Sequence, residues 1–502
     1  MKPSRIVLLV AALSVVLLLP HLSFAGATDP VTVVPAPEGQ GDIFSPSTRL
    51  VEDLKQDYVE EEFLVSGTGT VYTYNDPPVR EEIIPQFEDV PYTTRIIVRR
   101  PADAADFNGT VVIEWWNSTA GFDTAPVWDP SAEFFAREGW IYVGVTNSTT
   151  SMAFLVGGCR LFGLLPPSCG TRYSTLSLPE NGLAYEMVSQ IANVLKSSSP
   201  ENPLPAGFEV DRIFHAGQSQ QGGSMVTYAT AFHFPGNDGY FVQAAGSARP
   251  INFGPACGAE GSPPYPGCTP RLTGDARRVR TDLPVPVYRA QTETDMTGVL
   301  AGNTRQTDSG NFRYYEMAGT AHNTVHADVE VLPPALFPPN GLFLDDACLL
   351  PINSIADGPV LGSLLYNAMW QNMEDHARFG DDPPHGDLIA VDPMTGQVAR
   401  DEFGNALGGI RLPQLDVPVA TYGPHNTVNP FLPPFLQPLL NLFCILSGTN
   451  LAFDQATLDE LYPSKGSYVG PFSAATNALK AQGFLLGQDT KRLIHEAVKN
   501  GP

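Results

Sequence analysis

A serine in a glycine-rich turn is the first residue whose setting suggests chemistry. The stretch Ile213–Gly223 reads IFHAGQSQQGG: an apolar run leads into Gly217-Gln218-Ser219-Gln220-Gln221-Gly222, and an apparent helix over Met225–Phe232 follows. A strand, a sharp turn with one serine and a helix form the layout of a nucleophile elbow, where strain pushes the hydroxyl outward. The usual pattern is G-x-S-x-G, and here Gln221 stands at the fifth position, with glycine one residue later. The turn indicates a nucleophilic serine, and an ordinary glycine-rich turn is the alternative.

Two later strand ends carry the groups that such a serine needs. A serine becomes nucleophilic when a base removes its proton and a third group orients that base. Asp295 lies in the turn after the predicted strand Val285–Ala290, and His322 follows the predicted strand Phe312–Met317. The chain order serine, acid, histidine is that of a large class of hydrolases. We therefore expect a catalytic triad of Ser219, His322 and Asp295.

Both the acid and the base have rivals nearby. Glu293 precedes Asp295 by two residues and is the alternative acid. Asp295 is favoured because it lies three residues past Thr292, the spacing that the acid has in G-x-x-D turns. His326 is the alternative base, one helical turn beyond His322 and less closely tied to the end of the strand.

An oxyanion hole needs two N–H donors aimed at the developing negative charge. The first is expected from the backbone of Gln220, the residue after the serine. The second is expected from the loop Trp116–Gly121, with Asn117 or its neighbour as the donor. Asn117 also begins an Asn-Ser-Thr sequon, as Asn147 does, and Asn108 begins a third sequon. A glycosylated Asn117 would be unable to line a catalytic pocket.

Strands and helices alternate through most of the chain. Mostly apolar or alternating runs predict strands, and longer amphipathic runs predict helices. The predicted strands are 62–74, 95–99, 110–116, 140–145, 210–216, 240–244, 285–290 and 312–317, and the predicted helices are 132–138, 183–196, 225–232 and 362–379, with two closing helices over 470–499. This alternation implies a mostly parallel sheet with helices on both faces. Residues 28–60 form an N-terminal extension, and 380–450 are a loop-rich C-terminal elaboration.

The composition excludes several kinds of partner. The 502 residues carry 53 acidic and 29 basic side chains, for a net charge of −24. Because so few cations are free to neutralise phosphates, no nucleic-acid partner is expected. With 43% hydrophobic residues, the chain is able to bury a sizeable core. No C-x-x-C grouping suggests a metal site, so neither a metal nor an organic cofactor is expected.

The first 25 residues are typical of a secretory signal peptide. Lys2 and Arg5 precede a short apolar run, Ile6–Leu19, and Ser23-Phe24-Ala25 offers a small-x-small cleavage site. A membrane anchor is the alternative, but the run is short for a bilayer and no second run follows. We expect residues 1–25 to be removed, residues 26–502 to form one domain, and the product to be secreted or periplasmic with no stable membrane span.

Export would allow the six cysteines of the chain to form disulfides. An even count in an oxidising compartment indicates disulfides. Cys159–Cys169 and Cys257–Cys268 are the favoured pairs, because each encloses a short loop rich in glycine or proline. Cys348–Cys444 is then the remaining pair.

Three stretches are predicted to be cap-like insertions: about 146–180, 250–280 and 425–450. The third contains Asn429–Leu446 (NPFLPPFLQPLLNLFCIL), an apolar run with four prolines, which exclude a membrane helix or a central strand. Met152–Leu165 has a similar character. Such runs either cover the serine with an apolar inner face or simply pack against the core. We hypothesise that 429–446 is a cap lining an acyl pocket, with Phe431 and Phe435 on its inner face.

The chain resembles the family called alpha/beta hydrolase domain proteins, which are mostly exported bacterial chains. The matching stretches are 58–72, 94–117, 137–145, 216–223, 285–295, 313–322 and 404–422, of which GNALGGIRLPQLDVPVATY (404–422) is the most family-specific. The family usually shows G-x-S-Q-S-G at the elbow, and Gln221 replaces the second serine of that pattern here. The resemblance implies an α/β-hydrolase fold and serine hydrolase chemistry, with Ser219 and His322 on motif positions.

These observations together predict an exported serine hydrolase that cleaves carboxylic esters of small molecules through an acyl-enzyme, with a preference for apolar esters. An acyltransferase using the same triad is the alternative within enzymes. A catalytically silent scaffold that acts as a binding protein is the alternative outside them, although such a scaffold has no reason to keep all three residues.

Overall fold

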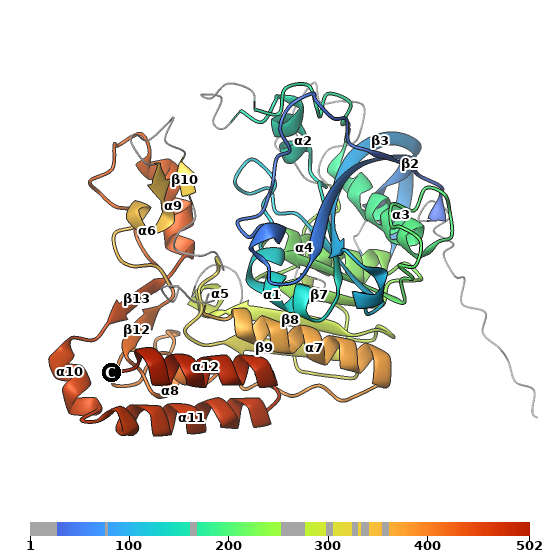
Figure 1. Ribbon diagram of the computed structural model, residues 1–502. Coiled ribbons are helices and arrows are strands. Elements are labelled where there is room, and N and C mark those ends of the chain that lie inside the picture. Colours follow the sequence, from blue (N-terminus) through green and yellow to red (C-terminus); the bar gives the residue numbers. More distant parts are fainter. Residues whose placement is uncertain are drawn as a thin grey trace, which may run out of the picture.

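A nine-stranded sheet forms the centre of the molecule (Figure 1). This computed structural model describes residues 28–75, 79–160, 168–252, 277–297, 305–323, 330–332, 341–353 and 361–502. Across the sheet the strands run in the order β1 (Thr32–Pro35), β2 (Tyr58–Tyr74), β3 (Ile83–Pro101), β5 (Ile141–Val145), β4 (Thr110–Trp115), β6 (Arg212–Gln218), β7 (Gly239–Gln243), β8 (Val287–Thr292) and β9 (Phe312–Met317). Pairing is parallel from β5 to β9 and antiparallel from β1 to β5, which confirms the predicted mostly parallel sheet.

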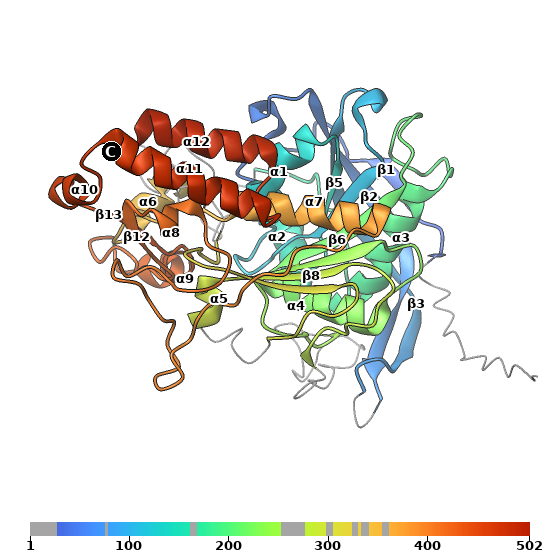
Figure 2. The same ribbon diagram turned by 90° about the horizontal axis from the view of Figure 1, so that it is seen from below.

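Each face of the sheet has its own apolar core. On one face, Val111 and Ile113 of β4 pack in a cluster with α3 (Ala184–Lys196) and α4 (Gln220–Thr227). On the other face, Val112 packs in a cluster with α1 (Trp128–Arg137) and α7 (Ser363–Phe379). Figure 2 shows α7 lying along this second face. Strands covered on both faces need nearly continuous apolar runs, which is why these strands were recognisable in the sequence.

The antiparallel edge is larger than the sequence suggested. β2 and β3 form a long hairpin that pairs Tyr58 with Pro101 at one end and Tyr74 with Ile83 at the other. The sequence pattern predicts strands only at 62–74 and 95–99 in this region, because the polar outer part of β3 lacks a continuous apolar run. β1 extends this edge by pairing with β2, so part of the predicted N-terminal extension belongs to the sheet.

Two stretches predicted as loops contain helices. Residues 146–180 include α2 (Thr149–Val156), whose first turn is capped by the Ser148 hydroxyl. The loop-rich 380–450 includes α8 (Pro413–Asp416), β12 (Ala420–Gly423) and α9 (Gln437–Leu446). Pro438 lies in the first turn of α9, where a proline removes no intrahelical hydrogen bond. The helix predicted at 225–232 begins earlier, at Gln220, and ends in a π-helical turn over Tyr228–Phe232.

The C-terminal residues extend the second face and build a small lobe. α10 (Gln455–Leu461) leads to α11 (Lys465–Ala481) and α12 (Gly487–Asn500), which pack together beside α7 (Figure 2). A group that we call the C-terminal lobe stands apart from the sheet in Figure 1. It consists of β10 (Glu330–Leu332), β11 (Leu342–Phe343), α6 (Leu344–Ala347), α9 and the residues 428–436 that lead into α9. β12 and β13 (Thr449–Ala452) pair at its base.

None of the helices that the structure describes is long and apolar enough to cross a membrane. The expected signal peptide (1–25) and most of the insertion at 250–280, with Cys257 and Cys268, lie outside the described residues. So does His326.

Candidate active site

Ser219 stands at the turn between β6 and α4 in a strained backbone conformation. Its φ is 56° and its ψ is −114°, and few other described non-glycine residues have a positive φ. Its backbone N–H donates to the carbonyl of Gln243 at 2.9 Å, which ties the turn to the end of β7. Strain of this kind persists only where the surrounding structure enforces it, and it is the backbone feature of a nucleophile elbow.

Close contacts explain both the glycines and the departure from the usual motif. A Cβ at Gly217 would lie 2.5 Å from the carbonyl oxygen of Gln221. A Cβ at Gly222 would lie 2.6 Å from the Cβ of Ala245 and 2.7 Å from the carbonyl oxygen of Gln243. Both positions therefore exclude any side chain. The position between them has room for one, since Gln221 is buried and its Nε2 donates to Asn147 Oδ1 at 2.8 Å. The close contacts thus occur at Gly222, so this turn needs its second glycine one residue after the fifth position of the usual G-x-S-x-G pattern.

The structure brings Asp295 and His322 together. Asp295 Oδ1 lies 2.6 Å from His322 Nδ1, and both side chains are buried. Its Oδ2 accepts hydrogen bonds from the backbone and hydroxyl of Thr292, at 2.9 and 2.7 Å. Burial by itself would raise the pKa of Asp295, but the charge and hydrogen bond of His322 and the Thr292 donors outweigh it and lower that pKa below 3.8. Asp295 is therefore an ionised partner for the imidazole.

Glu293, the alternative acid, faces other partners. Its Oε1 pairs with Arg400 at 2.6 Å, and its Oε2 accepts from the backbone N–H of Gly319 at 2.8 Å. Burial raises its pKa, against the opposing effect of Arg400 and the Gly319 N–H. Glu293 therefore anchors the loop that carries His322, and within the described part of the chain its oxygens form no hydrogen bond with the His322 ring.

The loop of His322 is joined directly to the turn of Ser219. Gln218, the residue before the serine, donates from its Nε2 to the carbonyl of His322 at 2.9 Å. The His322 N–H in turn donates to the Thr294 hydroxyl at 3.1 Å. Among the described residues Ser219 Oγ has no hydrogen-bond partner, and catalytic contacts of this kind are often long before substrate binds.

The loop after β4 lies against the same turn. Asn117 Nδ2 donates to the carbonyl of Gln218 at 3.1 Å, on one side of Ser219. On the other side, both the N–H and the hydroxyl of Ser118 donate to Gln220 Oε1, at 3.1 and 2.8 Å. The backbone N–H of Asn117 is engaged with the carbonyl of Thr124 at 3.0 Å. Its neighbour Ser118 is thus the better-placed source of a backbone donor, and no sequence pattern separates the two residues.

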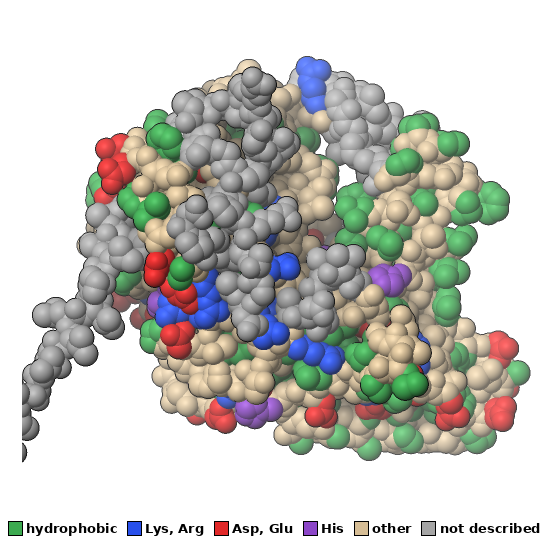
Figure 3. Space-filling view, turned by 180° about the vertical axis from the view of Figure 1, so that it is seen from behind, with side chains coloured by type: hydrophobic (Ala, Val, Ile, Leu, Met, Phe, Trp, Pro, Cys, Tyr) green, Lys and Arg blue, Asp and Glu red, His purple; other side chains and the backbone are tan. Residues whose placement is uncertain are grey.

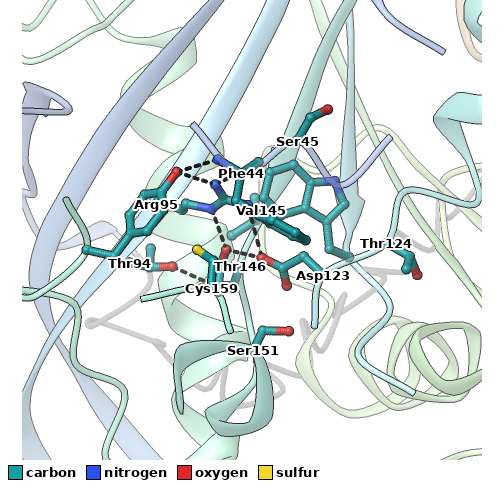
Figure 4. Close-up of polar contacts among 12 residues, drawn as sticks. Phe44, Ser45, Thr94, Arg95, Asp123, Thr124, Val145, Thr146, Ser151 and Cys159 are labelled. Atoms are coloured by element: carbon teal, nitrogen blue, oxygen red, sulfur yellow. Dashed lines mark hydrogen bonds and ion pairs between the residues drawn. The ribbon is translucent and has the colours of Figure 1, made fainter. Parts of the chain in front are cut away.

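A buried arginine, Arg95, binds the loop after β4 through Asp123. Arg95 Nη2 lies 3.3 Å from Asp123 Oδ2, and Thr146 Oγ1 donates to the same oxygen at 2.5 Å. Figure 4 shows the Arg95 side chain pointing toward Thr146 and Asp123. Arg95 also pairs with Glu62 at 2.9 Å and lies over the ring of Trp116, 5.0 Å from its centroid. Since Asp123 belongs to the loop of Asn117 and Ser118, Arg95 links that loop to β2 and β3.

The C-terminal lobe reaches the histidine loop through α9. The N–H of Asn323, next to His322, donates to the carbonyl of Leu446 at 2.8 Å, and its side chain donates to the carbonyl of Phe443 at 3.1 Å. The Cys348–Cys444 disulfide holds α9 to α6, and Cys159–Cys169 closes the loop after α2, so both described pairs are those that the sequence predicted.

The exposed side of the lobe is apolar. Phe431 and Phe435 are 91% and 74% exposed, and Leu442 and Ile445 are also exposed. Hydrophobic side chains on this part of the molecule are visible at the right of Figure 3. The two phenylalanines therefore do not line a closed pocket in this arrangement, contrary to the expectation for an inner face.

The asparagines of two of the three sequons are buried. Asn117 and Asn147 are both buried, and their side-chain amides are engaged with Gln218 and Gln221. A sugar on either side chain is therefore incompatible with this fold. In the described part of the chain, no group of three or more His, Cys, Asp or Glu side chains is placed to hold a metal ion.

The family of the chain follows from a comparison with protein-family models. The model described as "Alpha/beta hydrolase domain" matches residues 32–495. The chain belongs to this family. The match covers nearly the whole length described above, from β1 to α12, and agrees with the strand order of the sheet. The fold is thus that of an α/β hydrolase.

Solved structures of hydrolases are similar only at a distance. An alpha-beta serine hydrolase homologue from Coxiella burnetii is 13% identical, with a TM-score of 0.25 over 46% of this chain and 85% of that one. The rice cell wall degrading esterase LipA from Xanthomonas oryzae is 12% identical, with a TM-score of 0.20 over 37% and 43% of the two chains. No curated protein matches the chain in sequence. Similarity this distant says nothing about a substrate.

Proposed function

We propose that this α/β hydrolase is an exported serine hydrolase that cleaves carboxylic esters, with Ser219 as nucleophile, His322 as base and Asp295 as the acid that orients it. The observation that carries the proposal is the 2.6 Å contact between Asp295 and His322 beside the strained turn of Ser219. The bond from Gln218 to the carbonyl of His322 supports it, because it joins the two loops at the residue next to the serine.

The contacts suggest the following sequence of events. Ser219 Oγ attacks the ester carbonyl while His322 takes its proton, and the ionised Asp295 stabilises the imidazolium that forms. The N–H of Gln220, at the first position of α4, has no acceptor within the helix and is available to the oxyanion. His322 then gives its proton to the leaving alcohol, and water cleaves the acyl-enzyme.

Export is proposed on two grounds. The first 25 residues have the charge and hydropathy pattern of a signal peptide. Two disulfides, Cys159–Cys169 and Cys348–Cys444, are of a kind that persists in oxidising compartments.

An apolar ester is the proposed class of substrate. Between Val417 and Phe453 the chain has no Asp, Glu, Lys or Arg, and this segment includes α9, whose end contacts the residue beside His322. An uncharged apolar surface so near the triad would favour an apolar acyl or alcohol group over a charged one.

The decisive experiment replaces the serine. In the parent protein we expect cleavage of p-nitrophenyl esters and covalent labelling by a fluorophosphonate. Ser219→Ala should lose both while keeping its unfolding temperature, because Oγ has no described hydrogen-bond partner. Ser174→Ala, at an exposed serine, is the matched control and should behave like the parent. Labelling and turnover that persist in Ser219→Ala would reject Ser219 as the nucleophile.

A further inference from the structure

Two donors of one residue converge on a single oxygen beside the proposed nucleophile. The Ser118 N–H and hydroxyl reach Gln220 Oε1 at 3.1 and 2.8 Å. Because a backbone N–H only donates, the atom it contacts must be the amide oxygen of Gln220 and not its nitrogen. One oxygen that accepts two converging hydrogen bonds has the surroundings that an oxyanion needs.

The position of this contact matches that of an oxyanion hole. Ser118 follows β4, which pairs with β6 directly below the turn. Asn117 contacts the residue before Ser219 and Ser118 contacts the residue after it, so the two residues bracket the serine. Ser118 itself is buried, whereas Gln220 is only half-buried, so part of Gln220 is exposed to solvent.

We propose that the Gln220 side chain occupies the oxyanion position beside Ser118 until substrate displaces it. This inference rests on the proposed function and adds one residue role to it. In the reaction, Ser219 Oγ bonds to the carbonyl carbon and the C=O electron pair moves to oxygen. That oxygen takes the place of Gln220 Oε1 and accepts from the Ser118 N–H and hydroxyl, while the Gln220 backbone N–H stays in position as the other donor.

The exchange favours the transition state over the bound ester. Hydrogen bonds to an ionised acceptor are about twice as strong as those between neutral groups. A neutral ester carbonyl therefore gains little by replacing the neutral amide oxygen of Gln220, whereas the oxyanion gains much. Displacing Gln220 therefore costs free energy that lowers kcat/KM, and the stronger hydrogen bonds to the oxyanion offset this cost only as the charge develops.

Three substitutions at Gln220 test the displacement. Gln220→Ala and the similarly sized Gln220→Met both remove the acceptor and keep the backbone N–H. Each should raise kcat/KM for p-nitrophenyl acetate, and the rate constant of fluorophosphonate labelling, by about three- to tenfold, the factor that corresponds to one net hydrogen bond. Gln220→Glu keeps an acceptor and makes it charged, so it should lower both by about tenfold or more. Gln482→Ala, at an exposed glutamine after α11, is the control and should match the parent.

Combining these variants with Ser118→Ala shows whether the Gln220 side chain competes with the substrate for Ser118 or only holds Ser118 in place. In the parent, Ser118→Ala loses one oxyanion donor and also loosens the resting contact, so the two effects partly offset. In the Gln220→Met background only the loss remains, and the fold-decrease in kcat/KM should be larger by about three- to tenfold. Equal decreases in both backgrounds would overturn the proposal.

The remaining outcomes distinguish a failure of the Gln220 displacement from a failure of the proposed hydrolase function. Lower kcat/KM and slower labelling in both Gln220→Ala and Gln220→Met would mean that the side chain supports the site, and would overturn the proposal whether or not the unfolding temperature falls. A parent that no fluorophosphonate labels would instead refute the proposed function. A parent that is labelled at Ser219, with Gln220 variants that are labelled no faster, would leave the hydrolase standing and reject the displacement alone.

Discussion

Replacing Asp295 by asparagine should nearly abolish turnover. The carboxylate accepts from His322 Nδ1 at 2.6 Å and is itself held by two donors of Thr292. An amide at this place cannot stabilise an imidazolium, and it favours the wrong imidazole tautomer when its nitrogen faces the ring. In serine hydrolases with this arrangement such a change lowers kcat by about 10⁴. We expect about 10³- to 10⁴-fold here, or about 4–5.5 kcal/mol of lost transition-state stabilisation.

Glu293→Gln is the matched comparison, because Glu293 lies in the same turn and is equally buried. It should lower kcat/KM by less than about tenfold, since its oxygens serve Arg400 and Gly319 and not the imidazole. It should instead lower the free energy of unfolding by about 1.5–3 kcal/mol, the usual worth of a hydrogen bond to a charged group. Asp295 also adds stability, because its folded-state pKa is lowered. That contribution is present above pH 3.8 and is lost as the pH falls through the lowered value.

The assay is kcat and KM for p-nitrophenyl acetate in both variants, with urea unfolding of each at the same pH. A triad through Asp295 requires a large loss of kcat in Asp295→Asn and a mainly structural loss in Glu293→Gln. If Glu293→Gln lost more turnover than Asp295→Asn, the roles of the two carboxylates would have to be exchanged. Turnover that neither change affects by more than tenfold would reject a triad with an acid in this turn.

Three further predictions follow from the lobe, the disulfides and the buried arginine. The double variant Phe431→Ser/Phe435→Ser should keep the unfolding temperature of the parent, because both rings are exposed. It should lower the ratio of kcat/KM for octanoate esters to kcat/KM for acetate esters. An unchanged ratio would mean that the lobe does not contact the acyl chain. Removing the Cys348–Cys444 disulfide should lower the free energy of unfolding by about 5 kcal/mol, and removing Cys159–Cys169 should lower it by about 3 kcal/mol, because the first disulfide closes the longer loop. The reverse order in urea titrations would contradict this prediction. Arg95→Met leaves Asp123 buried without its cation, while Glu62 keeps its pair with Arg172, and should cost about 3–5 kcal/mol, with lower kcat; an unchanged urea midpoint would contradict it.

The sequence was most informative where strands are buried on both faces. The apolar runs of β4, β6, β8 and β9 were recognisable because almost every residue in these strands is buried. Parallel strands end at the same edge, so residues just past β8 and β9 meet there. This is why Asp295 and His322, chosen from their places after two strands, are found in contact.

Contacts between distant segments were not visible in the sequence. Glu293 pairs with Arg400, which is more than a hundred residues away, and no local pattern indicates such a partner. The choice of Ser118 over Asn117 as oxyanion donor depends on the hydrogen bond from the Asn117 N–H to the carbonyl of Thr124, which only the folded loop reveals. α9 was missed because its prolines lie before and within its first turn, where a helix tolerates them.

The loop of His322 is where the separate parts of the chain meet. Gly319 is held by Glu293 from the turn after β8, His322 by Gln218 from the elbow, and Asn323 by Leu446 from α9. Asn353, beyond the disulfide residue Cys348, donates to the carbonyl of Gly319 at 2.6 Å. The C-terminal lobe and the proposed triad therefore share one short loop. A displacement of α9 has to move the backbone next to the proposed base, so changes in the lobe are expected to alter kcat as well as substrate preference.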